Sequence, residues 1–347
     1  ISQLDSPVIA DAFVRGVRDL GYKSAATAAN ELIDNSFQSG SSVVALDFLT
    51  YKNKVNEIFI VDNGHGMIPG MLRAAARWGG THREGDRSGF GRYGYGLPSA
   101  SVSQGKKFTV YSKAAIEGSK WHKITVDLSI LDEGGKASDL IGDVEEAVLP
   151  EFLDGYVVKN SNGDEIMNIS DMSSGTIVHW DKLDKLKWKN PNDFESNMMT
   201  NIGTTYWRFL SNRSVYLMGK RVQGLDPLFV TPGLRGYEDP NGVKAEEVKH
   251  EDIEIKTKDS DHKEIIRVRF SYIHPKFVWE DGKRNENTLR WKTLSAHRGL
   301  IVSRNGRQID ILTNLRGKNK LEYNLQPYDQ YWKCETDFPA TLDEDFS

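Results

Sequence analysis

Residues 89–96 read Gly-Phe-Gly-Arg-Tyr-Gly-Tyr-Gly, and no other segment constrains the local fold as strongly. Closely spaced glycines let successive backbone N–H groups point at the same phosphate oxygens. Residues 97–101 can then begin a helix whose dipole also favours an anion, with Pro98 tolerated in the first turn. The segment lacks the Gly-Lys-Ser/Thr of a Walker loop and the context of a dinucleotide fingerprint. It predicts a phosphate-binding loop of another kind, with a flexible loop as the alternative.

A second segment, Asp62-Asn63-Gly64-His65-Gly66-Met67, directly follows an expected strand. A carboxylate at a strand end can accept a hydrogen bond from the amino group of an adenine, and the glycines let the backbone approach the ring. Further along, the hydroxyl of Thr176 in a Gly-Thr pair could support Asp62 and the adenine. The alternative is an ordinary Asp-Asn-Gly turn.

A third segment, Glu31-Leu32-Ile33-Asp34-Asn35, lies in an expected helix over residues 24–38. Glu31 and Asn35 are one turn apart and share a face of the helix. Asn35 offers the neutral oxygen that suits Mg²⁺ beside phosphates, and Glu31 can deprotonate a water for attack on a γ-phosphate. The alternative is a polar stripe that faces solvent.

In their order and spacing, these segments resemble the Bergerat ATP site of the gyrase, heat-shock chaperone, histidine kinase and MutL superfamily. The resemblance covers residues 20–185 and implies an α/β fold, with a two-layer sandwich that binds ATP and Mg²⁺ beneath a lid over residues 79–92. Glu31 would be catalytic and Asn35 would also ligate Mg²⁺. The implied nucleotide-binding residues are Asn35, Asp62, Gly64, Gly66, Met67, Gly91, Arg92, Tyr93, Gly94, Tyr95, Gly96 and Thr176.

Three features indicate which branch of the superfamily the sequence resembles most. Histidine kinases usually begin this helix motif with Asn or His and carry a dimerising phosphoacceptor helix before it, so Glu31 favours hydrolysis over phosphotransfer. Residues 91–96 are closest to the Microrchidia (MORC) pattern Gly-x-Tyr-Gly-x-Gly, although Leu97-Pro98 replaces its following lysine. Residues 216–222 and 299–307 resemble strands of the transducer domain of gyrases, MutL proteins and MORC ATPases.

Transducer domains of this superfamily usually send a basic residue to the γ-phosphate. Lys318 and Lys320 are the catalytic candidates, on an expected loop over residues 314–320. Arg304 and Arg307, on an expected hairpin around Asn305-Gly306, are alternatives. A solvated basic loop, with the true residue beyond Ser347, is a further alternative.

The length of 347 residues predicts two domains. We place the ATP-binding domain with a helical arm at residues 1–190. A transducer-like α/β domain follows at 191–347, truncated at its C-terminal end. The remaining expected elements are helices over 6–20 and 195–210 and strands over 43–49, 57–61, 107–112, 121–128, 177–180 and 265–273.

Both ends look trimmed from a larger protein. The apolar stretches are too short to span a membrane and no leader is evident. The single cysteine, Cys334, excludes an internal disulfide and a cysteine-based zinc site. A cytoplasmic location is therefore expected, or a nuclear one if the source is eukaryotic.

The leading functional hypothesis is an ATP-gated dimeric clamp that acts on duplex DNA. Residues 283–320 carry ten Lys or Arg against two acids, whereas residues 238–261 are acid-rich. The basic side chains can contact phosphates, or they can pair with the acid-rich segment instead. The alternatives are a heat-shock-type chaperone that remodels proteins and a nucleotide-gated scaffold with negligible turnover.

Overall fold

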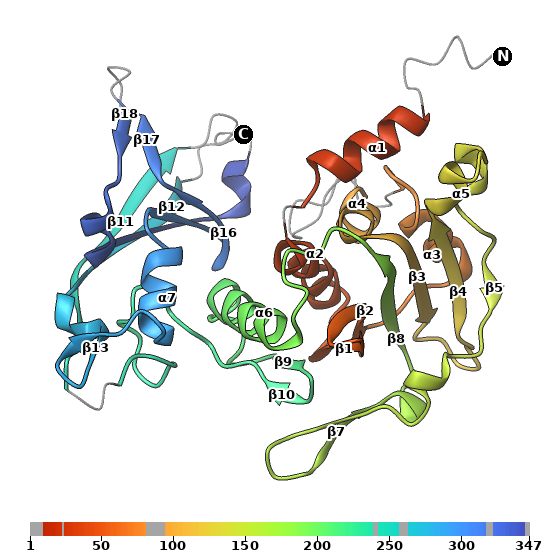
Figure 1. Ribbon diagram of the computed structural model, residues 1–347, viewed down its shortest axis with the longest axis horizontal. Coiled ribbons are helices and arrows are strands. Elements are labelled where there is room, and N and C mark those ends of the chain that lie inside the picture. Colours follow the sequence, from red (N-terminus) through yellow and green to blue (C-terminus); the bar gives the residue numbers. More distant parts are fainter. Residues whose placement is uncertain are drawn as a thin grey trace. The chain divides into compact units, whose positions relative to one another are not determined.

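The computed structural model describes residues 10–22, 24–80, 94–238, 242–256, 263–316 and 322–343 (Figure 1). The chain forms two compact units. Unit 1 comprises Ile1–Met199 and Asn212–Val222, and unit 2 comprises Thr200–Ser211 and Gln223–Ser347. Both units are mixed α/β structures, which confirms the predicted fold class. Among the described residues, no helix is long and apolar enough to cross a membrane.

Unit 1 is built on an eight-stranded sheet with the order β10-β9-β1-β2-β8-β3-β4-β5. The β1–β9 pair is parallel and the other pairs are antiparallel, so the sheet is mixed. Its strands are β1 (Val43–Tyr51), β2 (Lys54–Asp62), β3 (Gly105–Lys113), β4 (His122–Asp127), β5 (Glu145–Glu146), β8 (Gly175–Leu183), β9 (Ser214–Leu217) and β10 (Lys220–Arg221).

The helices of unit 1 begin and end where local chemistry permits. Ser24 caps α2 (Ala25–Gln38) in a capping box with Thr27, which confirms the predicted start of this helix. Helix α1 (Ala10–Leu20) packs against α4 (Gly96–Gln104), and α4 packs against α2 and the sheet. The other helices of this unit are α3 (Pro69–Ala75), α5 (Ser129–Asp132), η2 (Ala137–Asp139), η3 (Glu151–Leu153) and η4 (Ile169–Asp171).

The two faces of the unit 1 sheet have different covers. One face carries Ala45, Phe59 and Ile177, which are buried under a segment that includes β6 (Val157–Lys159) and β7 (Glu165–Asn168). The opposite face carries Ile60 and Val178 toward α2. Because side chains alternate along a strand, Asp62 at the end of β2 faces the same side as Ile60.

Unit 2 contains a five-stranded sheet with the order β11-β12-β19-β15-β16. Asn305 and Gly306 both have positive φ, and they form the predicted hairpin turn between β15 and β16. The sheet strands are β11 (Ala245–Lys256), β12 (Lys263–Ile273), β15 (Leu300–Arg304), β16 (Arg307–Leu312) and β19 (Trp332–Phe338). The other elements are α7 (Leu289–Ala296), η5 (Pro275–Val278), β13 (Trp279–Glu280), β14 (Lys283–Arg284), β17 (Asn314–Arg316), β18 (Glu322–Asn324), η6 (Pro327–Tyr331) and η7 (Ala340–Leu342).

The compact units divide the chain differently from the boundary expected before Pro191. The physical reason is strand pairing: β9 lies parallel to β1 and extends the unit 1 sheet after the chain has entered unit 2. Pro191 itself does not end structure but begins helix α6 (Pro191–Thr205), whose first amides bind the side chain of Asn190. The expected helix over 195–210 therefore starts and stops earlier.

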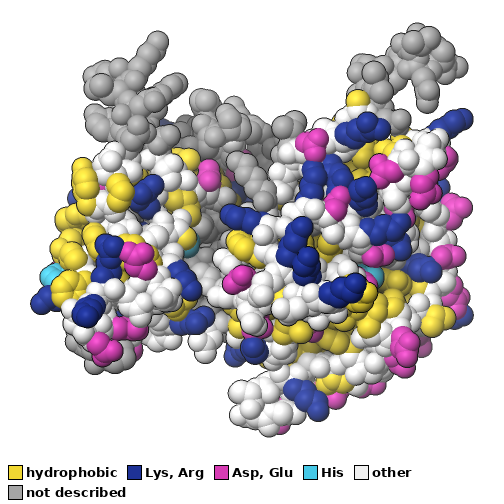
Figure 2. Space-filling model, in the orientation of Figure 1, with side chains coloured by type: hydrophobic (Ala, Val, Ile, Leu, Met, Phe, Trp, Pro, Cys, Tyr) yellow, Lys and Arg dark blue, Asp and Glu magenta, His cyan; other side chains and the backbone are white. Residues whose placement is uncertain are grey.

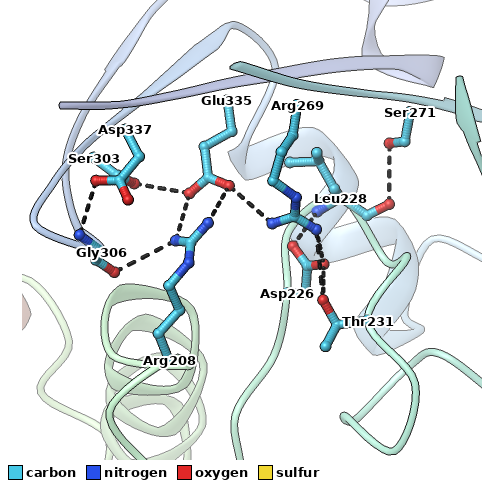
Figure 3. Close-up of polar contacts among 10 residues, drawn as sticks. All are labelled: Arg208, Asp226, Leu228, Thr231, Arg269, Ser271, Ser303, Gly306, Glu335 and Asp337. Carbon is cyan, nitrogen blue, oxygen red and sulfur yellow. Dashed lines mark hydrogen bonds and ion pairs between the residues drawn. The ribbon is translucent and has the colours of Figure 1, made fainter. Parts of the chain in front are cut away.

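A buried network of charges holds the sheet of unit 2 together (Figure 3). Glu335 is 1% exposed and accepts two hydrogen bonds of 2.8 Å from Arg208 and one of 3.0 Å from Arg269. Arg269 also donates to Asp226, 2.8 Å away. Burial favours the neutral acid, but the Arg208 and Arg269 partners outweigh it, so the pKa of Glu335 lies below its usual value.

Glu335→Gln should destabilise the protein by about 3–5 kcal/mol, because two partly buried guanidinium groups lose the buried carboxylate that they share. The pKa is lower in the folded state, so this contribution is present above pH 4.5 and is lost as the pH falls through the folded pKa. Urea unfolding at pH 7 measures the change. Glu146→Gln is the matched control, because Glu146 pairs with Lys120 on the surface and its loss should cost less than about 1 kcal/mol. Equal midpoints for the two variants would show that the network is not stabilising.

Candidate functional site

Unit 1 contains a cavity of about 400 Å³ between α2, the sheet and the start of α4. This volume is in the range of sites for small organic ligands. The cavity brings together predicted residues from segments that are more than a hundred positions apart in the sequence. The predicted residues that line it are Glu31, Asn35, Asp62, Gly66, Met67, Gly94, Tyr95, Gly96 and Thr176.

Some predicted residues do not line the cavity. Gly64 is absent from its wall and acts instead through its N–H, which donates to Asp62. Gly91, Arg92 and Tyr93 lie outside the described residues, as does the expected lid apart from Gly79 and Gly80.

Glu31 lies at the end of the cavity formed by α2 and the start of α4. The hydroxyl of Tyr22 donates a hydrogen bond to Oε2 of Glu31 over 3.0 Å. A Cβ atom at Gly96 would lie only 1.9 Å from Oε1 of Glu31, so a glycine is required there. The carboxylate is therefore fixed against the glycine-rich segment. Tyr22 was missed in the sequence because its contact depends on the fold.

Asp62 lies at the end of β2 and is 6% exposed. Its Oδ1 accepts from the Gly64 N–H at 2.8 Å, and its Oδ2 accepts from Ser36 Oγ at 2.9 Å. Burial raises the pKa of Asp62 to about 6, and these hydrogen bonds oppose the rise only in part. Such a carboxylate gains from a ligand that donates another hydrogen bond to it.

The segment after Asp62 is shaped by close packing. Gly66 has a φ of 62°, and a Cβ atom there would lie 1.9 Å from the carbonyl oxygen of Lys113. The Met67 N–H donates to Ser112 Oγ at 2.8 Å, and that hydroxyl lies 3.1 Å from the Thr176 hydroxyl. Thr176 pairs with Asp62 across β2 and β8, but its hydroxyl contacts Ser112, a residue the sequence did not single out.

Asn35 is the residue that the sequence predicts as a ligand of Mg²⁺. It is half-buried, lines the cavity and lies one turn after Glu31 on α2. No cluster of three or more His, Cys, Asp or Glu suited to a metal occurs among the described residues. Magnesium bound with a nucleotide needs only one or two protein oxygens because phosphates and waters complete its shell. The residues present therefore fit a magnesium–nucleotide complex.

The comparison with known families agrees with this geometry. Residues 22–147 match the family model described as "Histidine kinase-, DNA gyrase B-, and HSP90-like ATPase". The match includes Glu31, Asn35, Asp62 and the whole glycine-rich segment. It supports the Bergerat-type superfamily, and with it ATP binding and hydrolysis in general. A search of curated proteins found no match for the chain.

Several of the described basic residues in the region 283–320 are engaged within unit 2. Arg290 donates to the carbonyl oxygens of Gly236 and Phe277, which fixes it inside unit 2. Arg284 pairs with Glu286, and Arg304 makes two hydrogen bonds of 2.6 Å to Asp343.

The acid-rich segment has partners of its own, such as Lys263 for Glu254 and Lys244 for Glu238. The guanidinium of Arg307 lies 5.9 Å from the centre of the Tyr206 ring. Lys318 and Lys320 lie outside the described residues.

Proposed function

We propose that this protein is a magnesium-dependent ATPase that hydrolyses ATP to ADP and phosphate. The observation that carries the proposal is the placement of Glu31 and Asp62 at the same cavity, one beside the glycine-rich segment and one among the strands. Asp62 would accept a hydrogen bond from the adenine amino group. The backbone of residues 91–96 would bind the phosphates, and Asn35 would hold the Mg²⁺ that neutralises them.

Glu31 would act as the general base of the hydrolysis. It would take a proton from a water while the water oxygen attacks the γ-phosphorus, and the bond to the bridging oxygen of ADP would break. The Tyr22 hydroxyl would hold the carboxylate in the orientation that this transfer needs. Release of phosphate by wild type, measured beside the Glu31 variants described in the Discussion, tests this assignment.

We further propose that ATP gates a homodimeric clamp of the MORC or MutL branch, acting on duplex DNA in the cytoplasm or nucleus. Lys318 or Lys320 would contact the γ-phosphate. Arg284, Arg290 and Arg304 have partners within unit 2, so fewer basic side chains remain to contact duplex DNA. The chaperone and the scaffold are therefore kept as alternative functions. Salt-dependent binding to duplex DNA would favour the clamp over the chaperone, and measurable turnover would exclude the scaffold.

A non-hydrolysable ATP analogue should raise the average mass of the protein toward that of a dimer. Helix α1 packs on its own unit, where Phe13 contacts Trp78 and Arg18 donates to the Val102 carbonyl. Since Trp78 directly precedes Gly79 at the start of the expected lid, ordering of that lid would change the surface that α1 presents. Sedimentation velocity at high protein concentration measures the effect, with Asp62→Asn as a control that should need a higher concentration of the analogue for the same response. An unchanged mass for wild type would exclude the clamp in this chain.

A further inference from the structure

A second cavity, of about 480 Å³, lies within unit 2 between α7 and η6. Trp291 and Ser295 face it from α7, one turn apart, and Tyr328 faces it from η6. It belongs to neither the ATP site nor the buried network of Figure 3. The cavity is therefore a separate candidate site.

Aromatic rings form much of this cavity. Tyr328 is 71% exposed, so the face of its ring is accessible to a ligand at this cavity. Trp291 and Tyr331 instead pack against the buried core that includes Phe277 and Leu294, so they are held in place. Figure 2 shows hydrophobic and basic side chains next to each other on the visible face of this unit. The cavity thus combines an accessible ring with two anchored ones.

The charged groups at this cavity are arginines. The Arg284 guanidinium lies 4.7 Å from the centre of the Trp291 ring. Arg298 has a buried Nε for which the described residues supply no hydrogen-bond acceptor. None of the described residues that line the cavity is acidic, and Asp329 of η6 accepts instead from the Gln326 N–H of its own turn. Arg298 is half-buried and lines the cavity, so its guanidinium, with one donor that lacks a protein acceptor, favours an anionic ligand.

We propose that this cavity binds an unpaired nucleotide of single-stranded nucleic acid, with its base stacked on Tyr328 and a phosphate held by Arg298. A planar ring joined to a phosphate uses both features of the site. An acidic peptide would engage the arginines and leave the rings exposed, whereas a proline-rich peptide would cover the rings and leave the Arg298 Nε without an acceptor. Bases in a duplex are already stacked on each other, so an unpaired base fits better.

The test measures fluorescence anisotropy of a short labelled oligothymidylate and of a duplex of the same length, without ATP. The outcome is therefore independent of the proposed ATPase. Wild type should bind the single strand more tightly than the duplex. Tyr328→Ala should weaken that binding by about 5- to 100-fold, and Tyr328→Phe should retain it because the ring still stacks. Tyr51→Ala removes a similarly exposed tyrosine, 63% exposed, from unit 1 and should bind as wild type does.

Arg298→Ala should change the salt dependence of binding, which Tyr328→Ala should not. Loss of one phosphate contact lowers the slope of log affinity against log salt by about 0.7, whereas Tyr328→Ala leaves this slope unchanged. Arg73→Ala, which removes an exposed arginine of α3, is the control for loss of charge alone. Equal binding of single strand and duplex, no effect of Tyr328→Ala, or full displacement of the strand by polyglutamate would overturn the proposal.

Discussion

Glu31→Ala and Glu31→Gln are each expected to lower the rate of phosphate release by about 10² or more while ATP still binds. Neither side chain can accept a proton from water at neutral pH. Glutamine keeps the size of glutamate and an oxygen that can accept the hydrogen bond from Tyr22, so the cavity should keep its shape. Phosphate release under saturating ATP, with calorimetry of a non-hydrolysable analogue, measures the two effects separately.

Tyr22→Phe is the matched control for this experiment. It removes only the hydroxyl that orients Glu31 and keeps the carboxylate, so we expect a smaller loss of turnover than in either Glu31 variant. If Glu31→Gln released phosphate as fast as wild type, Glu31 would not be the base. If both Glu31 variants lost ATP binding as well, its role would be to hold the nucleotide.

Asp62→Asn is expected to weaken ATP binding by about 10- to 100-fold, because a charged acceptor is replaced by a group that can present its own N–H₂ to the adenine. The same change should stabilise the protein without nucleotide at neutral pH. Burial raises the pKa of Asp62 to about 6 from 3.8, so the folded state holds this proton more tightly than the unfolded state. Loss of ATP affinity together with a gain in thermal stability is therefore the expected signature.

The stability difference between Asp62→Asn and wild type should depend on pH, because Asp62 titrates at different pH values in the folded and unfolded states. The contribution of protonated Asp62 to stability is fully present below pH 3.8 and is lost as the pH rises through about 6. The stability advantage of Asp62→Asn should therefore grow between pH 5 and pH 8, toward an upper limit of about 3 kcal/mol. Thermal unfolding without nucleotide at several pH values measures it. An advantage that does not change with pH would show that Asp62 is ionised in the folded protein throughout this range.

The ATP affinity of wild type should rise with pH, whereas its stability relative to Asp62→Asn should fall. Below about pH 6, wild type should bind ATP less well as Asp62 becomes protonated, whereas Asp62→Asn should lack this component. The variant also corrects for titration of the phosphates of ATP, because both proteins meet the same nucleotide. Parallel pH profiles for the two proteins would remove Asp62 from adenine binding.

Local chemistry made parts of this protein predictable. Ser24 caps α2 in the predicted place, and the positive φ angles of Asn305 and Gly306 form the predicted hairpin. Asp62 lies at the end of its strand, as expected from the branched residues before it and the glycines that follow it. In each case the signal lies within a few neighbouring residues.

The remaining features depend on partners that are distant in the sequence. Nothing in residues 214–217 indicates that they pair with β1, and nothing near Arg290 indicates that backbone carbonyls of Gly236 and Phe277 will bind it. The same holds for Tyr22 beside Glu31 and for Ser112 beside Thr176. These contacts are selected by the packing of the whole unit, which periodicity and local propensity do not contain.

The placement of β9 has a consequence for dissecting the protein. The chain passes between the two units at three points, after Met199, Ser211 and Val222. A fragment that ends at Met199 would leave the backbone of β1 at an open sheet edge, where another chain can pair with it. A nucleotide-binding fragment would need residues up to Val222, including a stretch that belongs to the other unit. A single cut in the chain therefore cannot separate the two units, and recombination or deletion at one site between them would remove residues that both units need.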